Sequence, residues 1–224
     1  MENEITKQEP SWLKRARQIY WQRGVLALFW AGVVKILKSA FDTNSAIWFE
    51  RDLSQPIEES QARIPLTFVR DSPQKTLAWL RSFGHPGLVH PKEIETGIKE
   101  KHYFFHVRRD GGEIVGAQKV GYGKVYIVDF GKTVHFSQGT AFSYDAYVPP
   151  KLRGLGIATY LITQSLLFLK ERGYKKVLGH IPRWNQASIK AVKRCGFTVI
   201  GYVRFFKVFG FKFTLPNLDK VIRS

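Results

Sequence analysis

The chain has 224 residues, with 44% hydrophobic and 24% charged side chains, which is ordinary for a globular protein. Its single cysteine, Cys195, excludes an internal disulfide and a thiolate metal cluster, and it fits a reducing, cytoplasmic compartment. The six histidines show no spacing typical of a metal ligand set, so we expect no metal site.

The net charge of +17 is unevenly distributed along the chain. Residues 1–41 carry four more basic than acidic side chains, residues 42–150 are balanced, and residues 151–224 carry a surplus of thirteen. This distribution favours an anionic small molecule, an anionic membrane or nucleic acid as a partner, although a solvated basic surface explains it as well.

A basic helical arm followed by a polar connector is predicted for residues 1–63. No proline interrupts residues 11–41, and Ser11 can cap a helix there. The uncharged run 24–34 has eleven residues, whereas a membrane-spanning helix needs about 20. Basic and aromatic residues flank this run, which indicates a helix lying in the plane of the inner membrane surface. The alternative is an arm packed on the domain or on a second copy in a homodimer, and residues 42–63 form the connector.

A globular domain is predicted for residues 64–224. Its first half combines two helices, at 72–83 and 91–101, with strands at 64–69, 102–109, 113–120, 124–130, 133–137 and 141–148. Asp110-Gly111-Gly112 is typical of the turn of a hairpin, and the following short strands continue the same meander. After Pro149-Pro150 the pattern changes to helices at 155–172 and 185–195, with strands at 175–181, 197–203 and 205–213. This order predicts a mixed α/β (α+β) domain rather than a doubly wound parallel sheet.

The segment "PPKLRGLGIA", residues 149–158, leads from a strand into a helix. The first N–H groups of a helix have no partner within it, and together with the positive end of the helix they form a site for an anion. Gly154 and Gly156 allow a phosphate to approach the backbone closely, and Arg153 can add a charge-assisted hydrogen bond. The loop therefore predicts a phosphate-bearing ligand.

Two common phosphate loops do not match this segment. A Walker loop requires Gly-Lys followed by Ser or Thr, which is absent. A dinucleotide-binding fingerprint requires a third glycine where Thr159 stands, and a carboxylate at the end of the next strand, where His180 stands.

A third pattern does match. Residues 153–158, "RGLGIA", follow the pattern Arg/Gln-x-x-Gly-x-Gly/Ala, and residues 185–197, "NQASIKAVKRCGF", follow Asn-x-x-Ser-Ile and then Gly-Phe. With these two motifs in this order, residues 64–213 resemble the GNAT superfamily of acyl-CoA N-acyltransferases. Together with its arm, the chain is also similar to a bacterial group of such proteins, some associated with cell-surface polysaccharide biosynthesis. The resemblance implies a mostly antiparallel central sheet flanked by helices, and transfer of an acetyl group from acetyl-CoA to an amine.

The resemblance also implies which residues bind acetyl-CoA. The pyrophosphate would rest on the loop formed by Arg153, Gly154, Leu155, Gly156, Ile157 and Ala158. Tyr147 and Val148 would pair their backbone with the pantetheine arm, and Asn185 and Ser188 would lie near its pantetheine or adenosine part. The alternatives are a plain tight turn for the glycines and an ordinary helix N-cap for Asn185.

The attacking amine must lose a proton, which a carboxylate beside the thioester could take. Asp145 is the best candidate because it lies three residues before Val148, on the strand that would face the cofactor. Strand alternation predicts that Tyr147 shares the face of Asp145, while Tyr144 and Ala146 take the other face. Tyr144 is the second candidate for a catalytic side chain.

Other candidates for the chemistry are weaker. Glu113 and His180 are alternative bases, and Asp145 could instead be a salt-bridged aspartate at a strand edge. The family often places a tyrosine, as general acid, where this chain has Val192, so no general acid can be assigned. A thiolate leaves without such help, because the pKa of a free thiol is about 8.5. Cys195 has no basic partner in the pattern and is interpreted as a packing residue.

Three functions follow from these features. The first is N-acetyltransfer from acetyl-CoA to an unidentified amine, at the cytoplasmic face of a membrane. The second is a catalytically silent acyl-CoA-binding module on the same scaffold. The third is nucleic-acid binding, suggested by basic residues alternating with aromatic residues in 201–213, although strand alternation explains this pattern more simply.

Overall fold

The computed structural model describes residues 41–70, 72–84, 88–208 and 211–215. The predicted arm therefore lies outside the described residues, apart from Phe41. The chain divides into two compact units, a large one of 44–205 with 212–224 and a small one of 1–43 with 206–211. The four described helices and the candidate site residues belong to the large unit.

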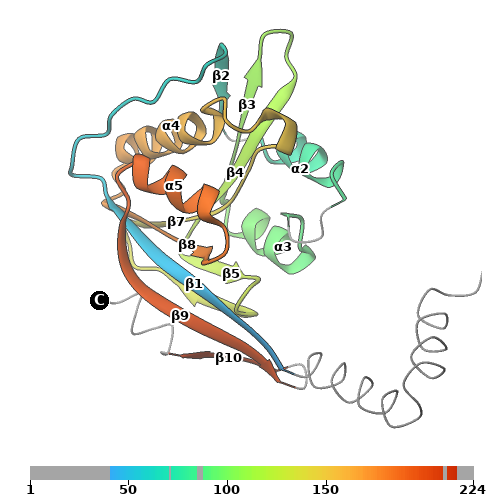
Figure 1. The fold of residues 1–224 in the computed structure, drawn as a ribbon, viewed down its shortest axis with the longest axis vertical. Coiled ribbons are helices and arrows are strands. Elements are labelled where there is room, and N and C mark those ends of the chain that lie inside the picture. The colour runs from blue at the N-terminus through green and yellow to red at the C-terminus, as the bar shows by residue number, and fades with distance from the viewer. Residues whose placement is uncertain (1–40, 71, 85–87, 209–210, 216–224) are drawn as a thin grey trace, which may run out of the picture. The chain divides into compact units, whose positions relative to one another are not determined.

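Eight strands form one sheet in the order β10-β9-β1-β8-β7-β4-β3-β2 (Figure 1). Its strands are β1 (Phe41–Asp52), β2 (Leu66–Val69), β3 (Tyr103–Arg109), β4 (Ile114–Tyr122), β7 (Thr140–Tyr147), β8 (Lys176–Pro182), β9 (Thr198–Val208) and β10 (Phe211–Leu215). The β7–β8 pair is parallel, whereas the pairs β1–β8, β2–β3, β3–β4 and β4–β7 are antiparallel. The predicted mixed α/β fold with a mostly antiparallel sheet is confirmed.

The described residues contain four α-helices, at positions close to those predicted. They are α2 (Pro73–Arg81), α3 (Pro91–Lys99), α4 (Ile157–Glu171) and α5 (Gln186–Arg194), and a short 3-10 helix covers Pro150–Leu152. Both α2 and α3 begin with a proline, which is favoured there because the first N–H groups of a helix have no partner within it. No helix in the described part of the chain combines the length and the apolar character that crossing a membrane requires.

The structure corrects the prediction of a polar connector for residues 42–63. Residues 41–52 form β1, a strand inside the sheet that pairs with β8. Trp48 and Phe49 point to opposite faces and are both buried, at 0% and 1% exposure. A strand covered on both faces shows no alternation of apolar and polar residues, and the charged residues near it concealed it in the sequence.

Two further predictions are corrected. The strands β5 (Lys124–Ile127) and β6 (Lys132–His135) form a separate two-stranded sheet rather than continuing the meander. The predicted break at residue 204 is absent, because β9 runs through it to Val208. Pattern analysis placed these segments correctly but could not assign their partners.

The helices cover both faces of the sheet (Figure 1). Leu161 of α4 and Ile189 of α5 share an apolar cluster with Val107 of β3, whereas Leu80 of α2 packs with Ala117 of β4. The residue before Ala117 is a glycine that faces α4, in keeping with strand alternation. We call the side covered by α2 and α3 the α2/α3 face.

Candidate active site

The parallel strands β7 and β8 pair only along part of their length. Thr140–Ser143 pairs with Lys176–Gly179, and beyond this point β7 continues on β4 while β8 continues on β1. In the described part of the chain, residues 144–148 and 180–182 therefore have no strand partner between them. The two strands separate immediately before Asp145, which leaves backbone groups of β7 available along this edge.

A β-bulge changes the direction of the side chains at this point. Lys119 of β4 lies opposite Tyr144 and Ala117 lies opposite Tyr147, so the single β4 residue between them faces two residues of β7, Asp145 and Ala146. Asp145 within the bulge has φ +51°, a left-handed conformation that is uncommon for a residue with a side chain. Tyr144 and Tyr147 consequently contact the same face of β4, and the predicted alternation, which put them on opposite faces, is wrong.

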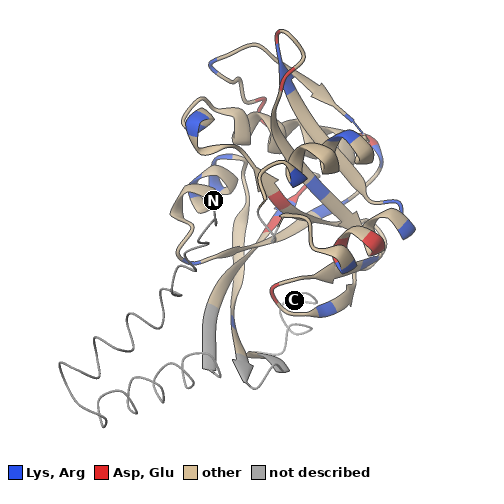
Figure 2. Ribbon diagram, turned by 90° about the vertical axis from the view of Figure 1, so that its right-hand side faces the viewer, with Lys and Arg blue, Asp and Glu red and all other residues tan. Residues whose placement is uncertain are grey.

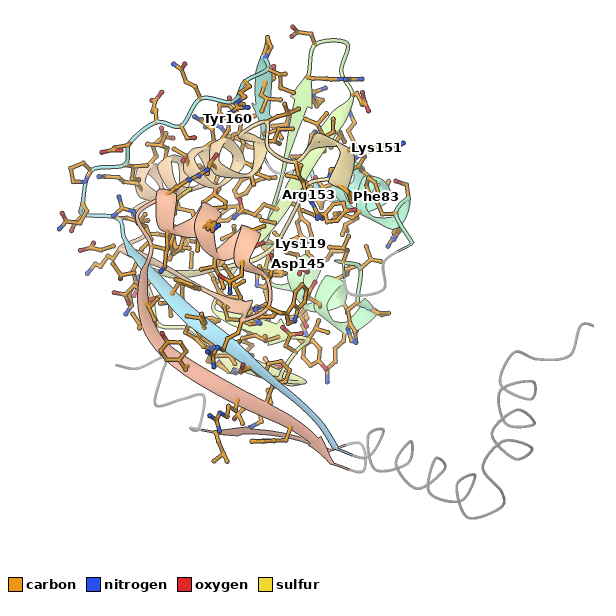
Figure 3. All side chains as sticks on the ribbon, in the orientation of Figure 1. Phe83, Lys119, Asp145, Lys151, Arg153 and Tyr160 are labelled. Atoms are coloured by element: carbon orange, nitrogen blue, oxygen red, sulfur yellow. The ribbon has the colours of Figure 1, made fainter. Side chains whose placement is uncertain are left out.

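The bulge brings Asp145 onto a buried lysine. The Nζ atom of Lys119 lies 2.7 Å from Oδ2 of Asp145, donates to the Leu88 carbonyl at 2.8 Å, and forms an ion pair with Glu93 of α3. The side chains of Lys119 and Glu93 are 1% and 5% exposed, whereas that of Asp145 is 28% exposed. Figure 3 shows Lys119 and Asp145 together beside β4. We call Glu93, Lys119 and Asp145 the charged triad; Asp145 is the member that solvent reaches most.

Burial and charge shift the proton affinities in the charged triad. Burial, and then the negative charge of Asp145, raise the pKa of Glu93 to about 8. Burial alone would lower the pKa of Lys119, but the two carboxylates outweigh it and raise this pKa. The lysine therefore stays charged, while Glu93 can gain or lose a proton near neutral pH.

The hydroxyl of Tyr144 belongs to a neighbouring hydrogen-bond chain. Nε2 of His102 lies 3.1 Å from the Tyr122 carbonyl, which can only accept, so this nitrogen carries the proton of the neutral ring. Nδ1 of His102, 3.2 Å away, then accepts from the Tyr144 hydroxyl. Burial lowers the pKa of His102, and burial with the two carboxylates of the triad raises that of Tyr144 well above its ordinary value. Tyr144 is thus a neutral donor to His102.

The loop after β7 presents backbone N–H groups at the start of α4. Gly154 and Gly156 have φ of +85° and +79°, and α4 begins directly after Gly156. Among the described residues, no acceptor is found for the N–H groups of residues 154–159. A Cβ on Gly156 would lie 3.3 Å from the backbone of Gln61 and Ala62, so a glycine is required here by packing as well as by φ. We call residues 149–159 the phosphate loop after the ligand that the sequence predicts for it, and this ligand stays a prediction.

Two predicted ligand contacts have partners within the chain. Nε of Arg153 donates to the Val148 carbonyl at 3.2 Å, which ties the phosphate loop to the end of β7. The side chain of Asn185 accepts from the Ser188 N–H at 3.2 Å and so caps α5. The helix-cap alternative for Asn185 is therefore what the structure shows, and its contact with CoA stays a prediction.

The comparisons with known proteins identify the family of this chain. The model of the family described as "Acetyltransferase (GNAT) family" matches residues 70–197. This range is more than half of the chain and includes α4, α5 and the charged triad. The chain belongs to the GNAT acetyltransferase family. Its members are N-acetyltransferases, and membership implies the use of an acyl-CoA and an acceptor substrate.

Solved structures support the GNAT fold at low sequence identity. A GCN5-related N-acetyltransferase from Sphaerobacter thermophilus is 14% identical, with 80% of this chain and 55% of that chain covered and a TM-score of 0.55. A GNAT acetyltransferase from Colwellia psychrerythraea is 18% identical, with 75% and 57% covered and a TM-score of 0.51.

A glucosamine N-acetyltransferase region in a fungal multi-domain β-N-acetylglucosaminidase is 15% identical, with 82% of this chain and 22% of that chain covered and a TM-score of 0.52. The chain spans just over half the length of the two bacterial proteins and about a fifth of the fungal one. No curated protein sequence matches the chain.

The weaker base candidates lie in other surroundings. Glu113 forms an ion pair with Arg109 at the turn between β3 and β4. Nε2 of His180 lies 2.8 Å from Asp129, and the ring stacks against Trp48 and Phe142 at the part of β8 that leaves β7. Burial raises the pKa of Cys195, whose side chain packs beside α4, in line with a packing role.

Sequence analysis missed Glu93 and Lys119 of the charged triad. Lys119 lies within the apolar run of β4, and a charge in such a run must be paired if the strand is buried. This signal was available, but it does not identify the partner. Glu93 lies on a short helix among other charged residues, and only the packing of α3 on the sheet distinguishes it.

Proposed function

We propose that this GNAT enzyme transfers an acetyl group from acetyl-CoA to an amine by direct attack, with Asp145 as the general base. The observation that carries the proposal is the position of Asp145. Its carboxylate is partly exposed at the point where β7 leaves β8, just before the phosphate loop. A base and an anion-binding loop thus follow one another along a single strand edge.

The N–H groups of residues 154–159 fit a pyrophosphate, because they need acceptors and stand at the positive end of α4. The edge of β7 at Tyr147 and Val148 would accompany the pantetheine arm. At about 3.3 Å per residue, the three residues from Val148 back to Asp145 span roughly 10 Å. The thioester end of the ligand would therefore lie near Asp145.

The amine nitrogen attacks the carbonyl carbon of the thioester, and its proton passes to Asp145. The electron pair of the broken C–S bond leaves with the sulfur as a thiolate. Because the pKa of a free thiol is about 8.5, this departure needs no positioned acid. Tyr144 donates its hydroxyl to His102, so the thiolate takes its proton from solvent in this scheme.

The first experiment measures CoA binding by calorimetry and turnover with a broad panel of primary amines, detecting free CoA. We expect sub-millimolar CoA affinity and turnover of at least one amine. Asp145→Ala should reduce kcat at least 100-fold and leave the CoA affinity within threefold, because a general base contributes about 10²–10⁴ in rate.

Asp110→Ala, in the exposed turn between β3 and β4, is the matched control. Absence of CoA binding at 1 mM would contradict the proposal as a whole. Full activity of Asp145→Ala would contradict only the role of Asp145. CoA binding without turnover of any amine would instead favour the silent binding module, an alternative that the missing tyrosine at Val192 keeps open.

We further propose that the basic arm holds the enzyme at an anionic membrane surface. The support is the sequence of residues 11–41, since the arm lies outside the described residues. In the described part, Lys and Arg occur on many elements rather than on one, with Asp and Glu among them (Figure 2). Sedimentation with phosphatidylserine vesicles should be lost when Arg15, Arg17 and Arg23 are replaced by Glu, and binding unchanged by these replacements would contradict the proposal.

A further inference from the structure

The charged triad brings one basic and two acidic side chains together, with Lys119 and Glu93 buried and Asp145 partly exposed. Lys119 is 1% exposed, and it contacts both Glu93 and Asp145. In the described part of the chain, no other Lys or Arg forms an ion pair with either carboxylate. With both carboxylates ionised, the triad carries one uncompensated negative charge, which is costly in a medium of low dielectric constant.

The groups facing the triad do not supply the missing charge. Tyr144 of β7 is a neutral phenol, and His102, which it contacts, is a buried ring whose pKa is lowered. His90 precedes α3 and stacks on Tyr126 of β5, which also contacts the exposed Lys92. Uptake of one proton is therefore the simplest way to neutralise the triad.

The helix α3 holds Glu93 firmly over the sheet. One turn after Glu93, Gly97 packs so closely that an added Cβ would lie 3.2 Å from Phe104 and 3.5 Å from the Tyr144 hydroxyl. This close approach sets the distance between α3 and the side chains of β3 and β7 beneath it, because Gly97 has no side chain of its own. The contact between Glu93 and Lys119 is thus built into the packing of the helix.

We propose that Glu93, Lys119 and Asp145 act as a single proton acceptor in acetyl transfer. Asp145 is the member that contacts the amine, and Glu93 and Lys119 are positioning residues that act through the contacts of the lysine with both carboxylates. The inference rests on the proposed function, since it explains how Asp145 serves as the base.

The reason lies in how the lysine shares its charge. A carboxylate beside an unshared ammonium has a lowered pKa and is a poor base. In the triad, Glu93 takes part of the interaction with Lys119, so the ammonium is not paired with Asp145 alone. When the amine nitrogen bonds to the carbonyl carbon, its proton goes to a carboxylate oxygen of Asp145, and the net charge of the triad changes from −1 to 0. Release of this proton to water restores the triad, and no other reactant is needed.

A first test needs neither an acceptor nor activity. Infrared spectroscopy of the CoA-free full chain, from pH 6 to pH 10, follows the C=O band of a protonated carboxyl group. We expect one buried carboxyl to lose its proton as the pH rises through about 8, where the pKa of Glu93 lies. The titration should disappear in Glu93→Gln and persist in Glu95→Gln, an exposed position on the same helix.

A second test follows kcat/KM against pH with an amine that the panel shows to be acetylated. Glu93→Gln should move the acidic limb at least one pH unit lower and reduce the plateau about tenfold or more, with the CoA affinity unchanged. Glu95→Gln should do neither. Because the amine is the same in each case, a difference between the pH profiles comes from an ionisable group of the enzyme and not from the amine.

The outcomes separate the two proposals. If no amine is acetylated, the proposed function fails, and the infrared titration still decides whether the triad takes up a proton. If the wild-type protein shows no carboxyl titrating in this range, or if Glu93→Gln retains the titration, the inference is wrong. Should Glu93→Gln fail to fold, the wild-type protein grown with carboxyl-labelled glutamate gives the same decision, because a titrating band unaffected by the label excludes Glu93.

Discussion

The phosphate loop and the charged triad lie next to each other, but the loop consists of backbone groups and the triad consists of side chains. The loop offers backbone N–H groups, so it depends on chain conformation, on the left-handed glycines and on the close approach of residues 61–62. The triad offers three side chains from α3, β4 and β7, and it depends on charge and burial. We therefore expect changes in the loop to act equally at every pH, and changes in the triad to depend on pH.

The largest effect is expected from Lys119→Met, which tests the triad directly. Loss of one partner from a buried ion pair costs about 3–5 kcal/mol of the free energy of unfolding. Without the ammonium, Glu93 is ionised at high pH at a greater cost, and it can be protonated at low pH. The loss, measured by urea denaturation, should therefore be larger at pH 9 than at pH 6.

Lys124→Met, at an exposed position on β5, is the control and should change little. An equal loss at both pH values for Lys119→Met would show that the triad acts only through packing, and it would remove the contrast with the loop.

The second prediction concerns conformation in the loop. Gly156→Ala should lower the free energy of unfolding by about 2 kcal/mol or more, because its φ of +79° is strained for alanine and its Cβ meets the 61–62 backbone. Gly154→Ala has the same strain at φ +85° but open space around it, so we expect about 1 kcal/mol. CoA affinity should fall about tenfold or more for Gly156→Ala. Either loss varying between pH 6 and pH 9 would contradict the comparison.

The third prediction concerns His106, a buried histidine on the α2/α3 face, and its effect on how stability depends on pH. Burial, with Arg108 and Lys75, lowers the pKa of His106 to about 4 from an ordinary value near 6.5. The unfolded chain therefore binds more protons between these values, and stability falls as the pH is lowered from 6.5 to 4. Allowing for solvent screening, we expect His106 to account for roughly 1–2 kcal/mol of this fall.

His106→Gln should flatten the dependence of the free energy of unfolding on pH in this range, whereas His135→Gln, at an exposed position on β6, should not. Parallel curves for wild type and His106→Gln would contradict the assignment.

The smallest effect is expected at Asn185, where two variants distinguish the helix-cap role from the predicted contact with CoA. Asn185→Ala should cost about 1 kcal/mol in the free energy of unfolding through loss of the α5 cap. Asn185→Asp keeps a capping oxygen and should keep the stability, but it adds a negative charge. If Asn185 lies near the phosphates of CoA, Asn185→Asp should weaken CoA binding several-fold by calorimetry, and an unchanged affinity would leave Asn185 with the capping role alone.

The same contrast explains how much could be predicted from the sequence. The phosphate loop depends on consecutive residues, so its glycines and prolines predicted both its place and the start of α4 within two residues. Helices beginning with Pro73 and Pro91 were predicted for the same reason. Features that arise only from contacts between distant elements were missed.

The bulge at Asp145 depends on the register between β7 and β4, which no local pattern determines. Lys119 has two ion-pair partners, Glu93 and Asp145. The first lies 26 residues before Lys119 in the sequence, and the second lies 26 residues after it. The strand β1 lacked the alternation that marks a half-buried strand, because apolar clusters cover both of its faces. The role of Asp145 as the base was predicted from its place before the loop and stays a prediction, whereas the lysine that it contacts was not predicted.

The position of β1 also has a consequence for folding during synthesis on the ribosome. β1 pairs with β8, which follows it by 124 residues at Asp52 and Lys176 and by 136 residues at Ala46 and Pro182. During synthesis, this early strand must wait with both apolar faces uncovered until β8 has left the ribosome. Pairing over such a sequence separation is slow, because a long loop must close before any contact stabilises it. We therefore expect nascent chains that end before residue 176 to recruit chaperones, and release to follow the emergence of β8 and β9.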